Sequence, residues 1–164
     1  MKRLLLLFAI CTSTALAGEL KPIPEKPAPA LALPRLDGGQ ARLDALRGSV
    51  VLVNFWAVWC PPCRKEMPSM ARLTKEMEAR PFTILAVNAG DSPDDVRAFL
   101  KQVPVNFPIL MDTEGTTLKP WQVFAFPTSY VVDRRGRLRL GLFGSIEWDD
   151  AETIAKLEAL LREK

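Results

Sequence analysis

The sequence predicts one α/β domain built around a mixed central β-sheet with helices on both faces. Strand-like and helix-like segments alternate from residue 31 onward, and 164 residues suffice for one domain with a substantial core. The run Val50–Trp56 is almost continuously apolar and rich in β-branched and aromatic residues, which is typical of a central strand buried on both faces. Two strand-like segments near the C-terminus should add an antiparallel part to a mostly parallel centre.

The first 17 residues have the pattern of a secretory signal peptide. Lys2 and Arg3 precede the apolar run Leu4–Ile10, and small residues ending in Ala15-Leu16-Ala17 provide a cleavage site. We therefore predict a signal peptide over 1–17 and a periplasmic or otherwise extracytoplasmic location. A retained membrane tether is the alternative. However, only 15 residues lie between Arg3 and Glu19, which is short for a membrane span of about 20.

Cysteine and histidine content limits the available chemistry. The chain has three cysteines and no histidine, which excludes Ser-His-Asp and Cys-His catalysis and any metal site that needs an imidazole. Cleavage after residue 17 would discard Cys11, and the residues before Cys11 match a lipoprotein signal poorly. Cleavage also lowers the formal charge from +3 to +1, because Lys2 and Arg3 leave with no acid, so nothing favours nucleic-acid binding.

Residues 18–34 are predicted to be a Pro-rich linker outside the core. Prolines recur through this stretch among Lys, Glu and Ala, a composition typical of a stiff, extended tether. The globular domain is therefore expected to cover 35–164. A β-hairpin is expected where the linker joins the domain, with strands at 31–36 and 41–43 around the turn Asp37-Gly38-Gly39.

The remaining elements follow from hydrophobic periodicity and capping signals. A helix is expected at 61–79, where Met67, Met70 and Leu73 recur at helical spacing. The other expected elements are a strand at 82–87, a helix beginning near Asp91-Ser92-Pro93, a strand at 107–111, a helical turn at 116–123, strands at 128–132 and 138–143, and a last helix beginning at Asp149 and Asp150.

The segment Trp59-Cys60-Pro61-Pro62-Cys63 carries the strongest functional signal. Two cysteines separated by two residues, between a buried strand and a helix, form a redox motif. The helix N-terminus favours a thiolate on Cys60, which would attack a partner's disulfide, and Cys63 would then resolve the mixed disulfide. Because both intervening residues are prolines without an N–H, we expect a less stabilised thiolate than in strong oxidants, and hence a reductant.

The same two cysteines admit other interpretations. A disulfide that closes so short a loop is a weak structural staple, which favours a redox role. Two thiolates could also hold Cu(I), so a copper-binding chaperone stays an alternative, whereas structural zinc needs four ligands. A general disulfide oxidase or isomerase would differ only in redox potential. Beyond the redox-active disulfide, no cofactor and no metal are expected.

The stretch Val51–Pro68, VLVNFWAVWCPPCRKEMP, resembles the TlpA/ResA-like thioredoxins, which are membrane-tethered or periplasmic bacterial proteins. The likeness continues at Val87–Ser92, Val105–Pro108, Asp112 and Phe126–Thr128. It implies a thioredoxin fold with an N-terminal β-hairpin and a βα insert before a cis-proline. It also implies protein disulfides as substrates, in apocytochrome c or in copper-assembly proteins, a membrane reductase as electron donor, and a monomer.

The resemblance assigns roles to individual residues. Pro127 matches a cis-proline that faces the dithiol, with Phe126 before it, whereas the residues alone favour an ordinary trans proline. Glu66 matches a glutamate that tunes the thiols, and its i+3 spacing from Cys63 places it on the same side of the helix. The alternative for Glu66 is a solvated helix glutamate.

Asn54 stands where thioredoxin has a buried aspartate. An amide cannot accept the proton, which strengthens the case for Glu66. Pro68 matches a helix-kinking proline with a structural role. The expected substrate-binding surface consists of Trp59, Pro61, Pro62, Phe126 and Pro127.

Overall fold

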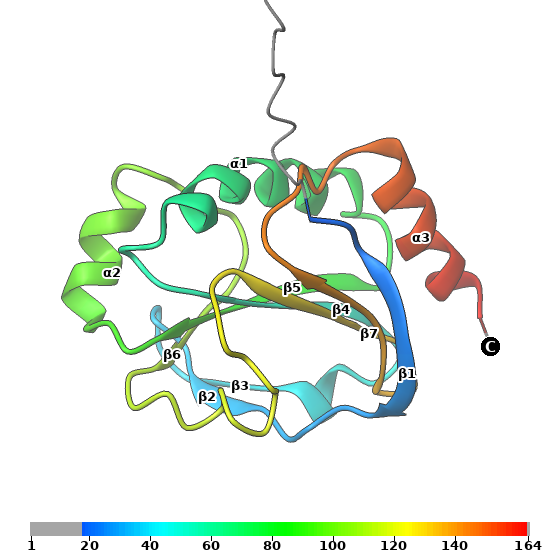
Figure 1. Cartoon of the computed structure of the whole chain (residues 1–164), viewed down its shortest axis with the longest axis horizontal. Helices are drawn as coiled ribbons and strands as arrows, with labels where there is room; N and C mark the ends of the chain where they lie inside the picture. Colours follow the sequence, from blue (N-terminus) through cyan, green and yellow to red (C-terminus); the bar gives the residue numbers. More distant parts are fainter. Residues whose placement is uncertain (1–17, 164) are drawn as a thin grey trace, which may run out of the picture.

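The computed structural model describes residues 18–163, which form a six-stranded sheet and a separate two-stranded hairpin (Figure 1). In the large sheet the strand order is β1-β8-β7-β4-β5-β6. Its strands are β1 (Lys21–Pro27), β4 (Val50–Trp56), β5 (Phe82–Ala89), β6 (Ile109–Asp112), β7 (Thr128–Val132) and β8 (Arg137–Phe143). Strands β4, β5 and β6 are parallel, and the other pairings are antiparallel. The mixed sheet is as predicted, and the signal peptide predicted at 1–17 lies outside the described residues.

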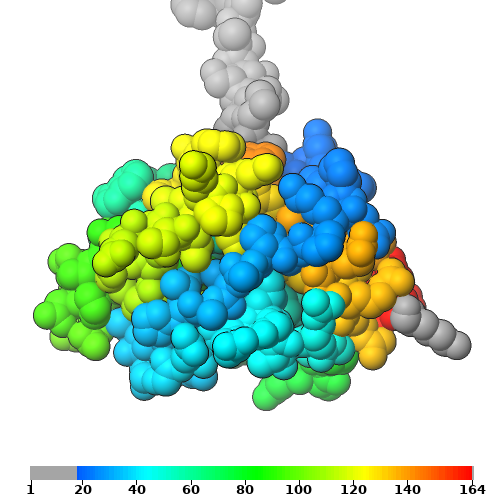
Figure 2. All heavy atoms as spheres, turned by 90° about the horizontal axis from the view of Figure 1, so that it is seen from below, coloured from blue at the N-terminus to red at the C-terminus, as the bar shows by residue number. Residues whose placement is uncertain are grey.

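Each face of the sheet has its own core. The helices α1 (Pro61–Glu76), α2 (Pro93–Leu100) and α3 (Ala151–Arg162) pack on one face. The other face is covered by the hairpin of β2 (Ala32–Pro34) and β3 (Gln40–Arg42), the 3-10 helix η1 (Leu43–Leu46) and the loop 113–126. Figure 2 shows this second face, with the hairpin in light blue and cyan and the loop in yellow. Within residues 18–163, no helix combines the length and the apolarity that crossing a membrane requires.

Strand β4 is apolar because both of its faces are covered. Leu52 and Trp56 point toward the helices, while Val53 and Phe55 point toward the hairpin, and all four are fully buried. A strand in this position tolerates a polar side chain only where a partner satisfies it. The one exception, Asn54, faces the helix side, where it has such partners.

The segment predicted as a helical turn, 116–123, consists of hydrogen-bonded turns, one of them helical, in which the N–H of Trp121 donates to the carbonyl oxygen of Thr117 at 3.1 Å. The carboxylate of Asp112, at the end of β6, accepts hydrogen bonds from the main-chain N–H groups of Thr116 and Thr117, each at 2.9 Å. These bonds satisfy donors that an irregular segment would otherwise leave unpaired. Pro120 has no N–H to continue a helix from this start.

Residues 18–34, predicted as a linker, contain an edge strand of the main sheet. Strand β1 pairs antiparallel with β8, from Lys21 opposite Gly141 to Pro27 opposite Arg137. Leu20, just before β1, is 2% exposed and belongs to the helix-side core. An edge strand needs only one row of its backbone groups paired, so its prolines do not prevent pairing. This corrects the predicted domain boundary at residue 35.

Replacing Leu20 with alanine is expected to lower the free energy of unfolding by about 2–4 kcal/mol, because the change removes a buried side chain from the core. Urea denaturation of the full chain would measure it. The control is Lys26→Ala in the exposed part of β1, expected to change stability by less than about 0.5 kcal/mol. Equal effects of the two substitutions would restore the linker interpretation.

Candidate active site

Cys60 and Cys63 lie at the N-terminus of α1, just after β4 ends. Cys60 is the N-cap residue, with extended backbone, and its Sγ accepts a hydrogen bond from the main-chain N–H of Cys63 at 3.2 Å. Pro61 and Pro62 occupy the first helical positions, where a missing N–H does not weaken the helix. The two cysteines are joined by a disulfide. The positive end of the α1 dipole is therefore directed at the Cys60 sulfur.

Exposed apolar side chains surround the disulfide. Cys60 is only 3% and Cys63 only 1% exposed, so a partner protein that reaches the disulfide must also contact the side chains around it. Trp59 is 68% exposed, and its ring centroid lies 5.7 Å from that of the half-buried Phe126. The rim, as we call it, consists of Trp59, Pro61, Pro62 and Phe126.

The Phe126–Pro127 peptide bond is cis, as the resemblance predicted. Thr128 pairs with Phe55, so Pro127 lies level with the last residue of β4, close to the start of the dithiol segment. The carbonyl oxygen of Pro127 accepts a hydrogen bond from the N–H of Gly144 at 2.9 Å. The fold thus brings Pro127 and the cysteines to the same end of the sheet.

Glu66 lies one turn further along α1 and is 1% exposed. Its Oε1 accepts a hydrogen bond from Asn54 Nδ2 at 2.8 Å, and its Oε2 accepts one from the indole Nε1 of Trp148 at 3.1 Å. Burial raises the pKa of Glu66 to about 7, and the hydrogen bonds from Trp148, Asn54 and the Ile146 amide offset this only in part. The interpretation of Glu66 as a solvated glutamate is therefore wrong.

Asn54 connects Glu66 to the strand that carries the cis-proline. Its Nδ2 also donates to Ser129 Oγ on β7 at 2.9 Å. Among the described residues, Asn54 Oδ1 has no hydrogen-bond partner. Because an amide does not accept a proton near neutral pH, Glu66 is the member of the Asn54–Glu66 pair that can take one.

Two residues at the site were missed by the sequence analysis. Trp148 reaches Glu66 from 82 positions away. The helix start predicted at Asp91-Ser92-Pro93 is confirmed, with Ser92 as the N-cap of α2, but Asp91 has a second role: its Oδ2 accepts a hydrogen bond from the N–H of Val58 at 2.8 Å. This bond fixes the segment that precedes Cys60, and no local sequence pattern encodes such a long-range contact.

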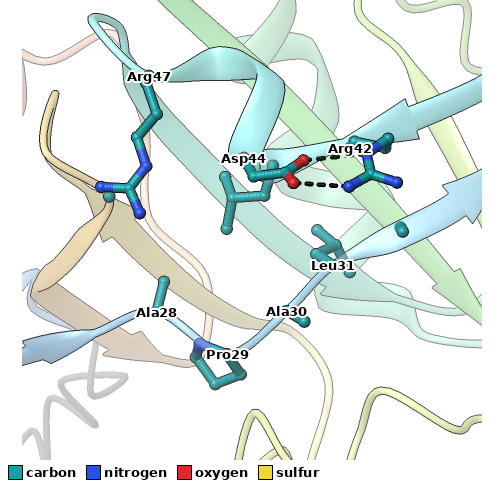
Figure 3. A pocket seen from close by; sticks show the side chains of 10 residues that line it. Ala28, Pro29, Ala30, Leu31, Arg42, Asp44 and Arg47 are labelled. Atoms are coloured by element: carbon teal, nitrogen blue, oxygen red, sulfur yellow. Dashed lines mark hydrogen bonds and ion pairs between the residues drawn. The ribbon is translucent and has the colours of Figure 1, made fainter.

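A hollow of about 130 Å³ lies at the other end of the sheet (Figure 3). It is lined by residues 28–32 and 42–44, with Arg47 beside it and Gly136 of the β7–β8 turn closing it. The ion pair between Arg42 and Asp44 also lies there. Since no cysteine and no buried carboxylate lines this hollow, we do not assign thiol chemistry to it.

Comparisons with known proteins are consistent with this geometry. The AhpC/TSA family matches residues 24–140. The thiol-disulfide oxidoreductase ResA of Bacillus subtilis is 37% identical over 111 residues, which are 68% of this chain and 62% of that protein. ResA of Geobacillus thermodenitrificans is 34% identical over 123 residues, 75% of this chain and 71% of that protein.

A solved structure shows the same fold. It is that of a Chlorobium tepidum protein thought to be the thiol:disulfide interchange protein DsbE, which is 36% identical and matches with a TM-score of 0.76 over 82% of this chain and 95% of that one. The thioredoxin fold expected from the resemblance is confirmed. Although the matched region spans less than two thirds of the B. subtilis protein, the family match covers most of this chain. The chain therefore belongs to the AhpC/TSA family, among its ResA-like members of thioredoxin fold.

Proposed function

We propose that this protein is an exported thiol–disulfide oxidoreductase that reduces disulfides in partner proteins. The observation that carries the proposal is the Cys60–Cys63 disulfide at the N-terminus of α1, beside the cis-proline and inside the rim. The names of the ResA relatives support the activity. The basic and apolar N-terminal pattern supports export.

The reduced protein transfers two electrons to its partner in two steps. The Cys60 thiolate attacks one sulfur of the partner's disulfide, which forms a mixed disulfide and releases the other sulfur as a thiolate that takes a proton from water. Cys63 then loses its proton and attacks Cys60, which forms the Cys60–Cys63 disulfide and releases the partner's second thiolate. A dithiol donor returns the two electrons by the reverse exchange.

In this scheme Glu66 takes the proton of Cys63. Both side chains are buried, and their i and i+3 positions place them next to each other on α1. A carboxyl with a pKa of about 7 is ionised in part of the molecules near neutral pH and can both take and return a proton. Below that pH Glu66 is protonated, so we expect the resolving step to slow as the pH falls through about 7.

The substrate proposed is an oxidised Cys-x-x-Cys pair in apocytochrome c or in a copper-assembly protein, with a membrane reductase as the electron donor. The resemblance of the dithiol segment to TlpA/ResA-like thioredoxins supports this choice. The exposed Trp59 and Phe124, 68% and 89% exposed, offer apolar contact area to a protein partner. Turnover of an oxidised Cys-x-x-Cys-His peptide faster than glutathione disulfide would support a cytochrome substrate, and equal rates would contradict it.

The redox potential of the Cys60–Cys63 couple tests the direction of the reaction. We expect a value near or below about −270 mV against glutathione or dithiothreitol, as for a reductant. A value near about −120 mV would instead support the disulfide oxidase. Stoichiometric Cu(I) binding without disulfide exchange would favour the copper chaperone.

A further inference from the structure

The loop between β8 and α3, residues 144–150, connects the cis-proline with Glu66. At its start, the N–H of Gly144 donates to the carbonyl oxygen of Pro127 at 2.9 Å. Toward its end, the indole N–H of Trp148 donates to Glu66 Oε2 at 3.1 Å. Trp148 is fully buried, so no water competes for this hydrogen bond.

Trp148 is fixed against α1 by main-chain and side-chain contacts. Its main-chain N–H donates to Ser69 Oγ at 3.0 Å, and the Ser69 hydroxyl donates to the carbonyl oxygen of Glu66 at 2.7 Å. On either side of Trp148, Glu147 and Asp149 both pair with Arg72 of α1, at 3.1 and 2.5 Å. These exposed pairs add little stability, but they fix the position of the loop along the helix.

We propose that Trp148 is a positioning residue for the dithiol reaction: its indole N–H holds the Glu66 carboxylate and determines how readily Glu66 accepts the proton of Cys63. The inference rests on the proposed function and adds to it a residue outside the dithiol helix that controls the proton step. The proton passes from the Cys63 thiol to Glu66 and returns when the disulfide is reduced again.

The partners of Glu66 differ in which protonation state they favour. An indole N–H can only donate, and its hydrogen bond to a charged carboxylate is stronger than one to a neutral carboxyl, so Trp148 favours the ionised form of Glu66. Asn54 can serve either state, because turning its amide over would present the unpartnered Oδ1 to a protonated Glu66. Trp148 is therefore the side chain that biases Glu66 toward the proton-accepting form.

Few other groups face this carboxyl. From β4 and β7 it is approached by Asn54 and, through Asn54, by the Ser129 hydroxyl, and from the loop by the Ile146 amide. On α1 the titratable neighbours are the two cysteines, while Arg64 and Lys65 are exposed. Within residues 18–163, no charged side chain makes an ion pair or hydrogen bond with Glu66.

The test compares Trp148→Phe with Trp121→Phe. The first keeps an aromatic ring but removes the donor to Glu66, and we expect the midpoint of the Glu66 titration, followed by carbon NMR of its carboxyl in the oxidised protein, to rise by about one pH unit. The pH midpoint of the resolving step should rise equally. Trp121 is a matched control, since it is buried on the opposite face and donates to the carbonyl oxygen of Ala30 at 3.4 Å. Unchanged midpoints in Trp148→Phe, as in the control, would overturn the proposal.

A second measurement covers the case in which Trp148→Phe does not fold. In the unsubstituted protein, the indole N–H resonance of Trp148 should shift with the Glu66 titration and stop shifting in Glu66→Gln, whereas that of Trp121 should not follow it. An indole resonance of Trp148 that ignores the titration would overturn the proposal. Neither titration needs a substrate, so a chain that titrates as expected but exchanges no disulfide would contradict the proposed function alone.

Discussion

Replacing Cys60 with serine is expected to abolish disulfide exchange, whereas Cys63→Ser should stop the reaction at the mixed disulfide with the partner. Cys60 is the N-cap of α1, where the helix N-terminus stabilises a thiolate, and Cys63 is buried one turn further on. Without Cys60 no attack on the partner occurs, and without Cys63 no thiol releases it. Non-reducing electrophoresis and mass spectrometry, after mixing reduced protein with an oxidised Cys-x-x-Cys substrate, would detect the trapped complex.

Cys11, the cysteine outside the dithiol motif, offers a matched control. Cys11→Ser makes the same chemical change within the predicted signal peptide, and we expect it to leave both the rate and the products of exchange unchanged. Accumulation of a covalent complex with Cys60→Ser rather than with Cys63→Ser would reverse the assignment of nucleophile and resolving thiol.

The central strands and the start of α1 were predictable because their signals are local. Strands β4 and β7 have the bounds expected from their apolar runs, 50–56 and 128–132, since both lie inside the sheet and are buried on both faces. Helix α1 begins at Pro61, as expected for proline in the first turn. It ends at Glu76 rather than at 79, where composition alone does not mark a boundary.

Strand β1 was missed because its composition and its pairing give opposite indications. Its prolines and charged residues are typical of a tether, and most of the strand is exposed. Only its pairing with β8, more than a hundred residues away in the chain, and the burial of the neighbouring Leu20 make it part of the domain. Neither property is encoded in a local pattern.

The candidate active site likewise has one part that local sequence patterns predict and another that depends on the tertiary fold. The spacing of Cys60 and Cys63 identifies the dithiol without a structure. The burial of Glu66 could not be derived from its neighbours, because Arg64 and Lys65 beside it suggest a solvated helix face. It follows from the arrangement of Asn54 and Trp148 around the carboxyl, which only the tertiary fold creates.

Replacing Glu66 with glutamine is expected to make the protein more stable above neutral pH and less active. Since the folded protein raises the pKa of Glu66 from 4.5 to about 7, the folded state binds more protons than the unfolded state between these values. The contribution of Glu66 to stability is therefore greatest below pH 4.5 and is lost as the pH rises through about 7, by up to roughly 3 kcal/mol. Glutamine cannot ionise, so this loss should be absent in the variant.

Glutamine fits the same hydrogen-bond partners. Its oxygen can accept from Trp148, and its NH₂ group can donate to the unpartnered Oδ1 of Asn54 once that amide turns over. The resolving step, in contrast, loses its proton acceptor and should slow by about 10²-fold or more. Urea denaturation of the oxidised protein from pH 4 to 9 and single-turnover kinetics would measure the two effects.

The opposite signs of these effects separate a functional carboxyl from a structural one. If Glu66 served only packing, Glu66→Gln would change stability and rate together, through a distorted fold. The control is Glu76→Gln at the exposed end of α1, which makes the same chemical change away from Asn54 and Trp148 and should leave the rate of the resolving step unchanged. A pH-independent stability difference between Glu66→Gln and the unsubstituted protein would show that the Glu66 carboxyl does not titrate within the fold, and Glu66 would then have to be removed from the proton step.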